Sequence, residues 1–313
     1  MFGTVLRMKR SLETLCKRYE KNPILTKDDI PFPCTSVFNA GVVKFRGEYV
    51  FLLRVEKPSG ISCLVLAKSK DGYNIEVEDR EIVFENNEEI FTTYESKGLE
   101  DPRITQLGDA YYILYTAYSD VGPRLSLAKT ENFKTFEKLA LVSHPQNKDA
   151  VLFPEKINDF YVRLDRPMYG NLSSMWISYS KDLLGWYNSK VVMSPRLGYW
   201  DSERVGACLV PLKTDHGWIE IYHGARITAS NKIYRLGIVV LDLKDPSKIL
   251  YRSDESLLSP LKDYERIGNV NNVVFSCGGV IEENGELKIY YGGADTCLCL
   301  ATVNIDDLLS YML

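Results

Sequence analysis

A pattern that recurs five times along the chain constrains its fold more than any other feature. Each copy has an apolar strand, a turn containing Gly or Asn, and then an aromatic-rich strand. In the first copy these are residues 40–45, Gly47 and residues 49–54. The turn residues of the copies are Gly47, Gly108, Asn158, Gly217 and Gly285, at separations of 61, 50, 59 and 68 residues. Such a spacing fits one four-stranded antiparallel sheet per copy.

Every copy also supplies a third strand that ends in a small polar turn, as at residues 64–71 and 125–130. In copies three and four we place the first strands at residues 153–157 and 206–210. Five small sheets in series, with β-branched and aromatic residues at alternate positions, are typical of a propeller. The sequence therefore predicts an all-β fold, a five-bladed β-propeller forming one domain over residues 1–313. The alternative is a β-sandwich followed by a second domain.

The segment before the first copy predicts a short N-terminal helix over about residues 6–20. Leu12, Leu15, Cys16 and Tyr19 fall on one side of this helix. An apolar stripe of this kind needs a cover. We expect it to pack on the blade edges or on a second subunit, which would give a homo-oligomer.

Composition excludes several classes of protein. With 313 residues, 45% of them hydrophobic and 26% charged, the chain can bury a substantial core. Its formal charge of -4 gives polyanions no general attraction, so no nucleic-acid partner is expected. No apolar run approaches the ~20 residues that span a membrane, and no signal-peptide pattern is visible, so we expect no membrane association and a cytoplasmic location. The seven scattered cysteines indicate reduced thiols and no metal site.

Aligning the copies predicts a functional site, because the first strands of propeller blades line a common channel. The second strands end at Arg54, Thr116, Arg166, His223 and Gly292. Three of these residues are cationic or can become so, and unpaired charge beside apolar neighbours is costly. The pattern therefore predicts an anion bound between Arg54, Arg166 and His223. The alternative is that each arginine pairs with a local carboxylate such as Glu56 or Asp165.

Asp101 opens the first strand of the second copy, in the stretch Gly98-Leu99-Glu100-Asp101-Pro102-Arg103. Pro102 biases Asp101 toward extended backbone, which constrains the direction of its carboxylate. We expect this carboxylate at the mouth of the channel, facing the cations, unless it serves only to cap a turn. The 20 tyrosines, with Trp200 and Trp218 near turns, favour a sugar ligand because pyranose faces stack on aromatic rings.

Several motifs together resemble those of glycoside hydrolase family 130, the five-bladed propeller family of β-mannoside phosphorylases. They lie at residues 37–43, 98–103, 151–156, 164–167, 221–224 and 290–296. The resemblance implies reversible phosphorolysis of a terminal β-mannosidic bond, which gives α-mannose 1-phosphate with inversion at the anomeric carbon. The implied partners are a β-mannoside of the manno-oligosaccharide or mannosyl-glucose type and inorganic phosphate as co-substrate, with no cofactor.

The resemblance also implies roles for individual residues. Asp101 matches the general acid, which is expected to act through a hydroxyl of the mannosyl unit. The positions implied to bind the sugar are Asn39, Arg54, Arg103, Asp165, Tyr222 and Asp295. The positions implied to hold phosphate are Arg54, Lys156, Arg166, Arg204 and His223, with Tyr222 close to them. Lys148 and Arg204 keep a positive charge where other members carry Arg and Lys.

Two other functions stay open at this stage. An inverting hydrolase needs an acid and a base carboxylate roughly 6.5–9.5 Å apart, whereas a phosphorylase needs only the acid. Related five-bladed hydrolases have a base aspartate where this chain has Asn39, which favours the phosphorylase. The first alternative is an inverting β-mannosidase with Glu203 or Glu155 as base. The second is a non-catalytic sugar-binding propeller.

Overall fold

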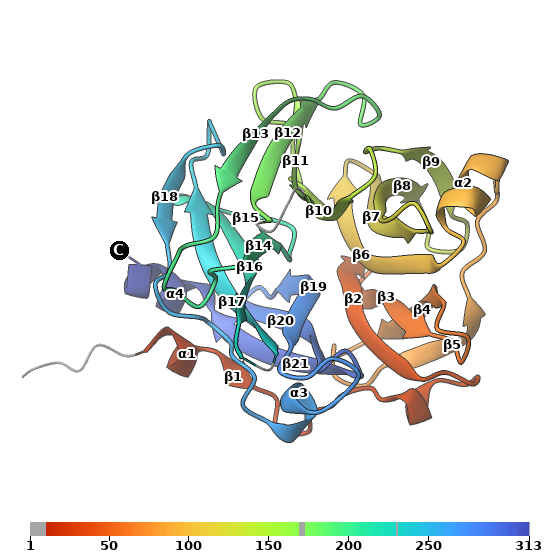
Figure 1. Cartoon of the computed structure of the whole chain (residues 1–313), viewed down its shortest axis with the longest axis horizontal. Helices are drawn as coiled ribbons and strands as arrows, with labels where there is room; N and C mark the ends of the chain where they lie inside the picture. Colours follow the sequence, from red (N-terminus) through yellow and green to blue (C-terminus); the bar gives the residue numbers. More distant parts are fainter. Residues whose placement is uncertain (1–10, 169–172, 230, 313) are drawn as a thin grey trace, which may run out of the picture.

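The computed structural model describes residues 11–168, 173–229 and 231–312, and the chain is built mostly of antiparallel β-strands. Figure 1 shows five sheets arranged in a ring around a common centre. The first two sheets are joined by one parallel contact between Ser62 and Gly98. The mainly β architecture expected from the repeats is therefore confirmed.

Each sheet is a meander of consecutive strands. The first has β2 (Ser36–Phe45), β3 (Glu48–Glu56), β4 (Ser62–Ser69) and β5 (Glu76–Glu81), and the second has β6 (Gly98–Leu107), β7 (Ala110–Tyr118), β8 (Arg124–Thr130) and β9 (Glu137–Leu141). The third has β10 (Asn147–Leu152), β11 (Tyr161–Pro167), β12 (Met175–Ser180) and β13 (Tyr187–Met193). Two-residue turns at Gly47 and Gly108 connect the first strands of their sheets to the second, as the repeat predicts.

The fourth and fifth sheets complete the ring. The fourth has β14 (Arg204–Ala207), β15 (Leu212–Thr214), β16 (Gly217–Ile227), β17 (Lys232–Leu241) and β18 (Ile249–Arg252). The fifth has β19 (Val274–Ile281), β20 (Glu286–Gly293) and β21 (Cys297–Asn304), with β1 (Lys17–Arg18) at its outer edge. The short helices are α2 (Glu89–Tyr94), α3 (Asp263–Arg266) and a 3₁₀ turn at Lys27–Asp29.

Buried apolar side chains fill the space between each sheet and the next. The clusters join Leu52 to Ile113, Leu127 to Leu152, Phe153 to Trp218, Ile221 to Tyr291, and Phe51 to Tyr290, in order around the ring. The last of these lies between the fifth sheet and the first, so the packing closes on itself. Sheet alternation explains the pattern, since successive side chains of a strand face opposite sides and both faces of each sheet have a neighbour.

The N-terminal helix is much shorter than expected. Helix α1 covers only Leu12–Leu15, and Lys17 and Arg18 extend instead as strand β1, paired with Thr302 and Ala301. The prediction was wrong at this point because the free edge of β21 offers backbone hydrogen bonds that a surface helix would forgo. Residues 6–10 of the expected helix lie outside the described residues.

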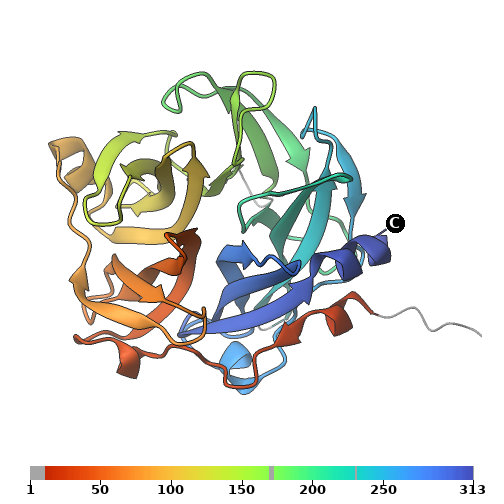
Figure 2. The same ribbon diagram turned by 180° about the vertical axis from the view of Figure 1, so that it is seen from behind.

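Helix α1 packs on its own chain. Leu12 is fully buried in the cluster that also holds Leu308 of α4 (Ile305–Met312), and Figure 2 shows α1 and α4 side by side. The Glu255 carboxylate accepts from the backbone N–H of Leu12 at 3.0 Å. Where it is described, the apolar stripe is therefore covered by residues of the same chain. An oligomer formed through this segment stays a prediction.

Two first strands lie elsewhere than expected. In the third copy the strand is β10 (Asn147–Leu152), and residues 153–157 lead into the turn. Pro154 lacks the N–H that a strand needs, which explains why pairing stops before it. In the fourth copy the expected strand at 206–210 is split into β14 and β15, and the backbone N–H of Cys208 donates to the buried carboxylate of Glu220 between them.

Within the described ranges, no helix is long and apolar enough to cross a membrane. The same residues contain no group of three or more His, Cys, Asp or Glu side chains placed to hold a metal ion. The seven cysteines are free thiols, six of them buried.

Candidate active site

A cavity of about 610 Å³ lies where the five sheets meet. We call it the central cavity, and every sheet contributes to its wall. Its charged and amide side chains are Asn39, Arg54, Lys97, Asp101, Asp120, Gln146, Lys148, Asp149, Arg166, Arg204 and Asp295, and Tyr118, Tyr234 and Phe275 supply aromatic surface. Residues more than 250 positions apart in the sequence thus share one wall, as the repeat alignment predicts.

Backbone bulges direct three of these side chains inward. The inner strands of the first three sheets each break register once, between Phe38 and Gly41, Glu100 and Arg103, and Lys148 and Val151. The residues in the breaks have left-handed backbone: Asn39 has φ of 49°, Asp101 of 51° and Asp149 of 57°. A bulge re-aims one side chain, and Asn and Asp tolerate this conformation best among residues with a Cβ. The three side chains therefore converge from equivalent positions of three sheets.

The extended geometry expected at Asp101 is wrong. Pro102 disfavours the right-handed helical region for the residue before it, and the bulge then holds Asp101 at positive φ. Neighbouring inner strands also approach closely here, since a Cβ added to Gly41 would lie 2.6 Å from the carbonyl oxygen of Pro102. Gly41 is thus required for the first and second sheets to meet at the cavity.

Asp101 is held by side chains of two sheets. Its Oδ1 accepts from Nδ2 of Asn39 at 2.8 Å and from Nη1 of Arg54 at 2.9 Å. The Nζ of Lys148 lies 3.8 Å from Oδ2. No turn N–H is among these donors, so Asp101 is not the turn cap considered as an alternative.

Electrostatics keep Asp101 ionised in the free protein. Burial alone would raise its pKa, but Arg54, followed by Lys148 and Arg103, outweighs that effect and lowers the pKa below its ordinary value. Arg54 itself is fixed between Asp101 and Glu100, whose Oε1 accepts from Nη2 at 2.9 Å. The partners of Arg54 are thus carboxylates of the next sheet and not Glu56, which the alternative interpretation named.

Three cations form another part of the wall. Lys148 makes only long contacts, at 3.4 Å to Glu100 and 3.8 Å to Asp101. Arg166 pairs with Asp149 through Nε at 2.7 Å and Nη2 at 2.6 Å, and Arg204 pairs with Glu203 at 2.6 Å. Among the described residues, Nη1 of Arg166 and Nε of Arg204 have no hydrogen-bond partner. The set can therefore still donate to an anion.

Asp149 is the residue that the sequence reasoning missed. It is fully buried and lies beside Arg166, Arg103 and His223, at 3.5 Å from Nε2 of the last. Burial would raise its pKa, but Arg166, His223 and Lys148 hold the pKa well below its usual range. The repeat does contain a signal for Asp149. Once the first strand of the third copy is placed at Asn147–Leu152, Asp149 occupies the position equivalent to Asn39 and Asp101.

Asp295 follows β20 and lines the cavity with φ of 51°. Burial raises its pKa to about 6, since Arg54 and Lys148 only partly oppose the effect of burial and the nearby Asp101 and Glu100 charges add to it. Two carboxylates in one cavity thus have pKa values displaced in opposite directions.

Two expected site residues lie behind the cavity wall. Arg103 is buried and donates to the backbone oxygens of Asp101, Ala207 and Cys208, so it positions the bulge. His223 is also fully buried, with its ring 4.7 Å from that of Phe275. Burial lowers its pKa to about 3, with Asp149 opposing and Arg166 and Arg103 reinforcing the effect. His223 is therefore neutral near pH 7, which corrects its assignment as a cation converging with Arg54 and Arg166.

Three further residues lie away from the central cavity. Lys156 is exposed, with Nζ 4.4 Å from the ring centroid of Tyr161. Tyr222 is buried against Trp200 and donates to Asp201 at 2.8 Å. Asp165 pairs with Arg163 in a separate pocket. Asp165 and Tyr222 each precede a residue of the cavity region on the same strand, and alternation turns adjacent side chains to opposite faces.

The two bases proposed for a hydrolase are outside the cavity as well. Glu155 is exposed and pairs with Lys213 at 2.6 Å. Glu203 pairs with Arg204 and Lys232 through Oε1, at 2.6 and 2.7 Å. Burial alone would raise the pKa of Glu203. Hydrogen bonds from Lys232 and Arg204 outweigh that effect and lower the pKa. Neither carboxylate lines the central cavity.

Comparison with known proteins gives a consistent result. The family model described as beta-1,4-mannooligosaccharide phosphorylase, of glycoside hydrolase family 130, matches residues 12–313. The chain is 38% identical to the 1,2-beta-oligomannan phosphorylase of Thermoanaerobacter sp. (strain X514), over 93% of this chain and 98% of that protein. It is 35% identical to the beta-1,4-mannooligosaccharide phosphorylase of Ruminococcus albus, over 94% and 90% of the two chains.

A solved structure agrees with these sequence matches. The beta-1,2-mannobiose phosphorylase from Listeria innocua, in complex with beta-1,2-mannobiose, superimposes with a TM-score of 0.86 at 31% identity, over 95% of this chain and 99% of that one. The chain belongs to glycoside hydrolase family 130, the family of β-mannoside phosphorylases.

Proposed function

We propose that the five sheets are the blades of one propeller and that the protein phosphorolyses terminal β-mannosides at the central cavity. The observation that carries the second proposal is the pairing, in one cavity, of a fixed carboxylate at Asp101 with three cations at Lys148, Arg166 and Arg204. The relatives named above act on β-1,2- and β-1,4-linked mannosides, which supports a mannoside as substrate and leaves either linkage possible.

In this reaction a phosphate oxygen attacks the anomeric carbon of the terminal mannosyl unit. The bond from that carbon to the glycosidic oxygen breaks, and the glycosidic oxygen takes a proton that Asp101 supplies. The products are α-mannose 1-phosphate and a saccharide shortened by one unit. Phosphate is already anionic, so the protein needs to position it and to deliver one proton.

Phosphate binding also helps Asp101 to hold that proton. In the free protein Arg54 and Lys148 favour the carboxylate and lower its pKa. A phosphate held by Lys148, Arg166 and Arg204 would offset their positive field and bring negative charge near Asp101, which raises the pKa of a carboxyl group. Binding of the co-substrate and protonation of the acid are thus coupled in the direction that the reaction needs.

A hydrolase is less well supported by the cavity. It would need a second carboxylate free to activate water. Glu155 and Glu203 lie elsewhere, and Asp149 is paired with Arg166. Asp295 does line the cavity, but burial raises its pKa to about 6 and the resemblance implies that it binds the sugar. Asn39 donates to Asp101 and carries no charge.

The phosphate dependence of turnover tests the proposal. β-1,2- and β-1,4-mannobiose are incubated with the protein at rising phosphate concentrations, and both mannose 1-phosphate and free mannose are measured. The proposal predicts a rate that saturates with phosphate and is negligible without it. Equal release of mannose without phosphate would refute the proposal in favour of the hydrolase.

A further inference from the structure

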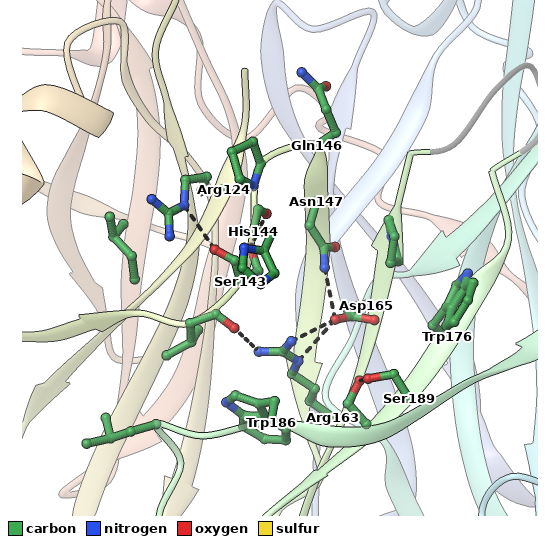
Figure 3. Close-up of a pocket in the computed structure, with 16 residues that line it drawn as sticks. Arg124, Ser143, His144, Gln146, Asn147, Arg163, Asp165, Trp176, Trp186 and Ser189 are labelled. Atoms are coloured by element: carbon green, nitrogen blue, oxygen red, sulfur yellow. Dashed lines mark hydrogen bonds and ion pairs between the residues drawn. The ribbon is translucent and has the colours of Figure 1, made fainter. Parts of the chain in front are cut away.

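A second pocket, of about 380 Å³, lies between the second and third sheets, and we call it the outer pocket. Arg124 and residues 141–146 form one wall, and one face of the third sheet, including Asn147, forms the other. Figure 3 shows Asp165 between Arg163 and Trp176, with Trp186 below Arg163. None of the steps proposed for the central cavity uses these side chains.

Strand alternation explains why this pocket is polar. On β11, Val162 and Leu164 face the apolar cluster shared with the fourth sheet, so Arg163 and Asp165 face the opposite side. Trp176 and Ser178 are their register partners on β12. The cluster between the second and third sheets has the fewest buried members of those between the five sheets described, so apolar packing does not fill this gap.

The floor of the outer pocket is a buried and electrically balanced group. Oδ2 of Asp165 accepts from Nδ2 of Asn147 at 3.1 Å and from Nε and Nη2 of Arg163 at 3.1 and 3.0 Å. Both charged residues of this pair are at least 95% buried. All three contacts use Oδ2, and Figure 3 shows the other carboxylate oxygen directed toward Trp176. The floor thus presents an acceptor without net charge.

The two tryptophans have different surroundings. The Arg163 guanidinium lies 4.3 Å from the ring centroid of Trp186, and the Trp186 indole donates to the oxygen of Leu183 at 2.9 Å. Trp176 is partly exposed and faces the pocket. Among the residues that the structure describes, no cationic side chain lies over its ring. An exposed aromatic face beside a carboxylate oxygen suits a pyranose ring, which has apolar faces and equatorial hydroxyl groups.

We propose that the outer pocket is a second saccharide-binding site, which takes a neutral pyranose unit stacked on Trp176 with its hydroxyls on Asp165. Arg163 and Asp165 balance each other at the floor, so the floor itself gives a sugar phosphate no attraction. Arg124 also lines the pocket and donates from Nε to the oxygen of Ser143 at 2.9 Å, so mannose 1-phosphate is included in the test as a competing ligand. Gln146 lines both the outer pocket and the central cavity, and Asn147 and Lys148 face one each, so the two sites adjoin across a single strand. The choice of mannosides as probes rests on the proposed function.

Calorimetric titration of the phosphate-free protein tests this site. The probes are manno-oligosaccharides of two to five units, with xylo-oligosaccharides as a second neutral series, and the Asp101→Asn background prevents turnover. If the two sites fill separately, Trp176→Ala should reduce the number of bound sugars per chain from two to one. If one molecule spans both sites, Trp176→Ala should lower the affinity for the longer oligosaccharides about tenfold and leave the affinity for mannobiose unchanged. Trp176→Phe keeps a ring and should lose less affinity than Trp176→Ala.

Controls separate this proposal from the proposed function. Tyr187→Ala removes an exposed aromatic of the same sheet outside the pocket and should leave binding unchanged. With Asp101 intact, Trp176→Ala should turn over mannobiose at the wild-type rate. If no phosphate-dependent turnover occurs, the proposed function fails while the titration still reports on the outer pocket. Unchanged stoichiometry and affinity for every oligosaccharide in folded Trp176→Ala, or binding of mannose 1-phosphate there without any neutral sugar, would overturn the second site.

Discussion

Arg54 on β3 donates from Nη1 to Oδ1 of Asp101 on β6 at 2.9 Å, so a cation of the first sheet fixes the carboxylate of the second. Both side chains are largely buried. Arg54 is therefore the largest influence opposing the effect of burial on the pKa of Asp101, and the net direction is downward. The acid role proposed for Asp101 then depends on the charge of the group that binds next to this pair.

Asp101→Asn should lower kcat by about 10²–10⁴, because general acid catalysis typically contributes that much. The fold should persist, since the asparagine side-chain oxygen can still accept from Asn39 and Arg54. Steady-state phosphorolysis rates and thermal unfolding check both points. Asp109→Asn, an exposed carboxylate in the turn after β6, is the matched control. Activity of Asp101→Asn within a few-fold of wild type would remove Asp101 from the mechanism.

Lys148→Ala should raise the KM for phosphate by about 10- to 100-fold, because a charge-assisted hydrogen bond contributes roughly 1.5–3 kcal/mol. Its long contacts to Glu100 and Asp101 leave the ammonium group available to an anion. The KM for the mannoside should change much less. Lys213→Ala, which breaks an exposed pair at Glu155, controls for loss of a positive charge. A change confined to the mannoside KM would assign Lys148 to the sugar.

Arg166→Ala should destabilise the protein by about 3–5 kcal/mol, the usual cost of leaving a buried charge without its partner. The charge in question is Asp149, which is fully buried and bonded to Arg166 at 2.6 Å. Denaturant unfolding measures the effect. The double variant Arg166→Ala/Asp149→Asn should recover part of the stability. A double variant less stable than Arg166→Ala alone would show that the charge of Asp149 is stabilised mainly by its other neighbours.

Asp295→Asn should change how stability depends on pH. The pKa of Asp295 is raised to about 6 in the folded protein and is near 3.9 in the unfolded chain. The folded state therefore binds the proton more tightly than the unfolded chain. Asp295 thus contributes on the order of 1–3 kcal/mol to the free energy of unfolding below pH 4, and this contribution is lost as the pH rises toward 6. Unfolding free energies at pH 4, 5 and 6 should fall less steeply in Asp295→Asn. Parallel curves for the two proteins would contradict the raised pKa.

Much of the fold could be predicted from the repeat, since the turns at Gly47 and Gly108 and the alternation of the strands depend on local sequence. The errors have local causes too. Aligning the third copy on the turn at Asn158 misplaces its first strand, because that strand contains the bulge at Asp149 and ends before Pro154. Strand β1 could not be predicted, because its pairing partner lies almost 300 residues away.

The site was predictable in part for a related reason. Arg54, Asp101 and Arg166 line one cavity because the repeat places them at strand ends and a strand start that meet. Asn39, Arg204 and Asp295 line it too, and only the family resemblance implied these three. The resemblance also implies sugar contacts for Asp165 and Tyr222, but a neighbouring residue on the same strand faces the cavity region, so alternation turns both side chains away from it. The neutral state of His223 depends on complete burial, which only the packed structure reveals.

Product identity tests the central claim most directly. The protein is incubated with β-mannobiose and phosphate in water enriched in ¹⁸O, and the first products are followed by NMR and mass spectrometry. The account predicts α-mannose 1-phosphate as the initial mannosyl product, with no ¹⁸O at its anomeric oxygen. Free mannose that carries ¹⁸O, formed at the same rate whether or not phosphate is present, would contradict it.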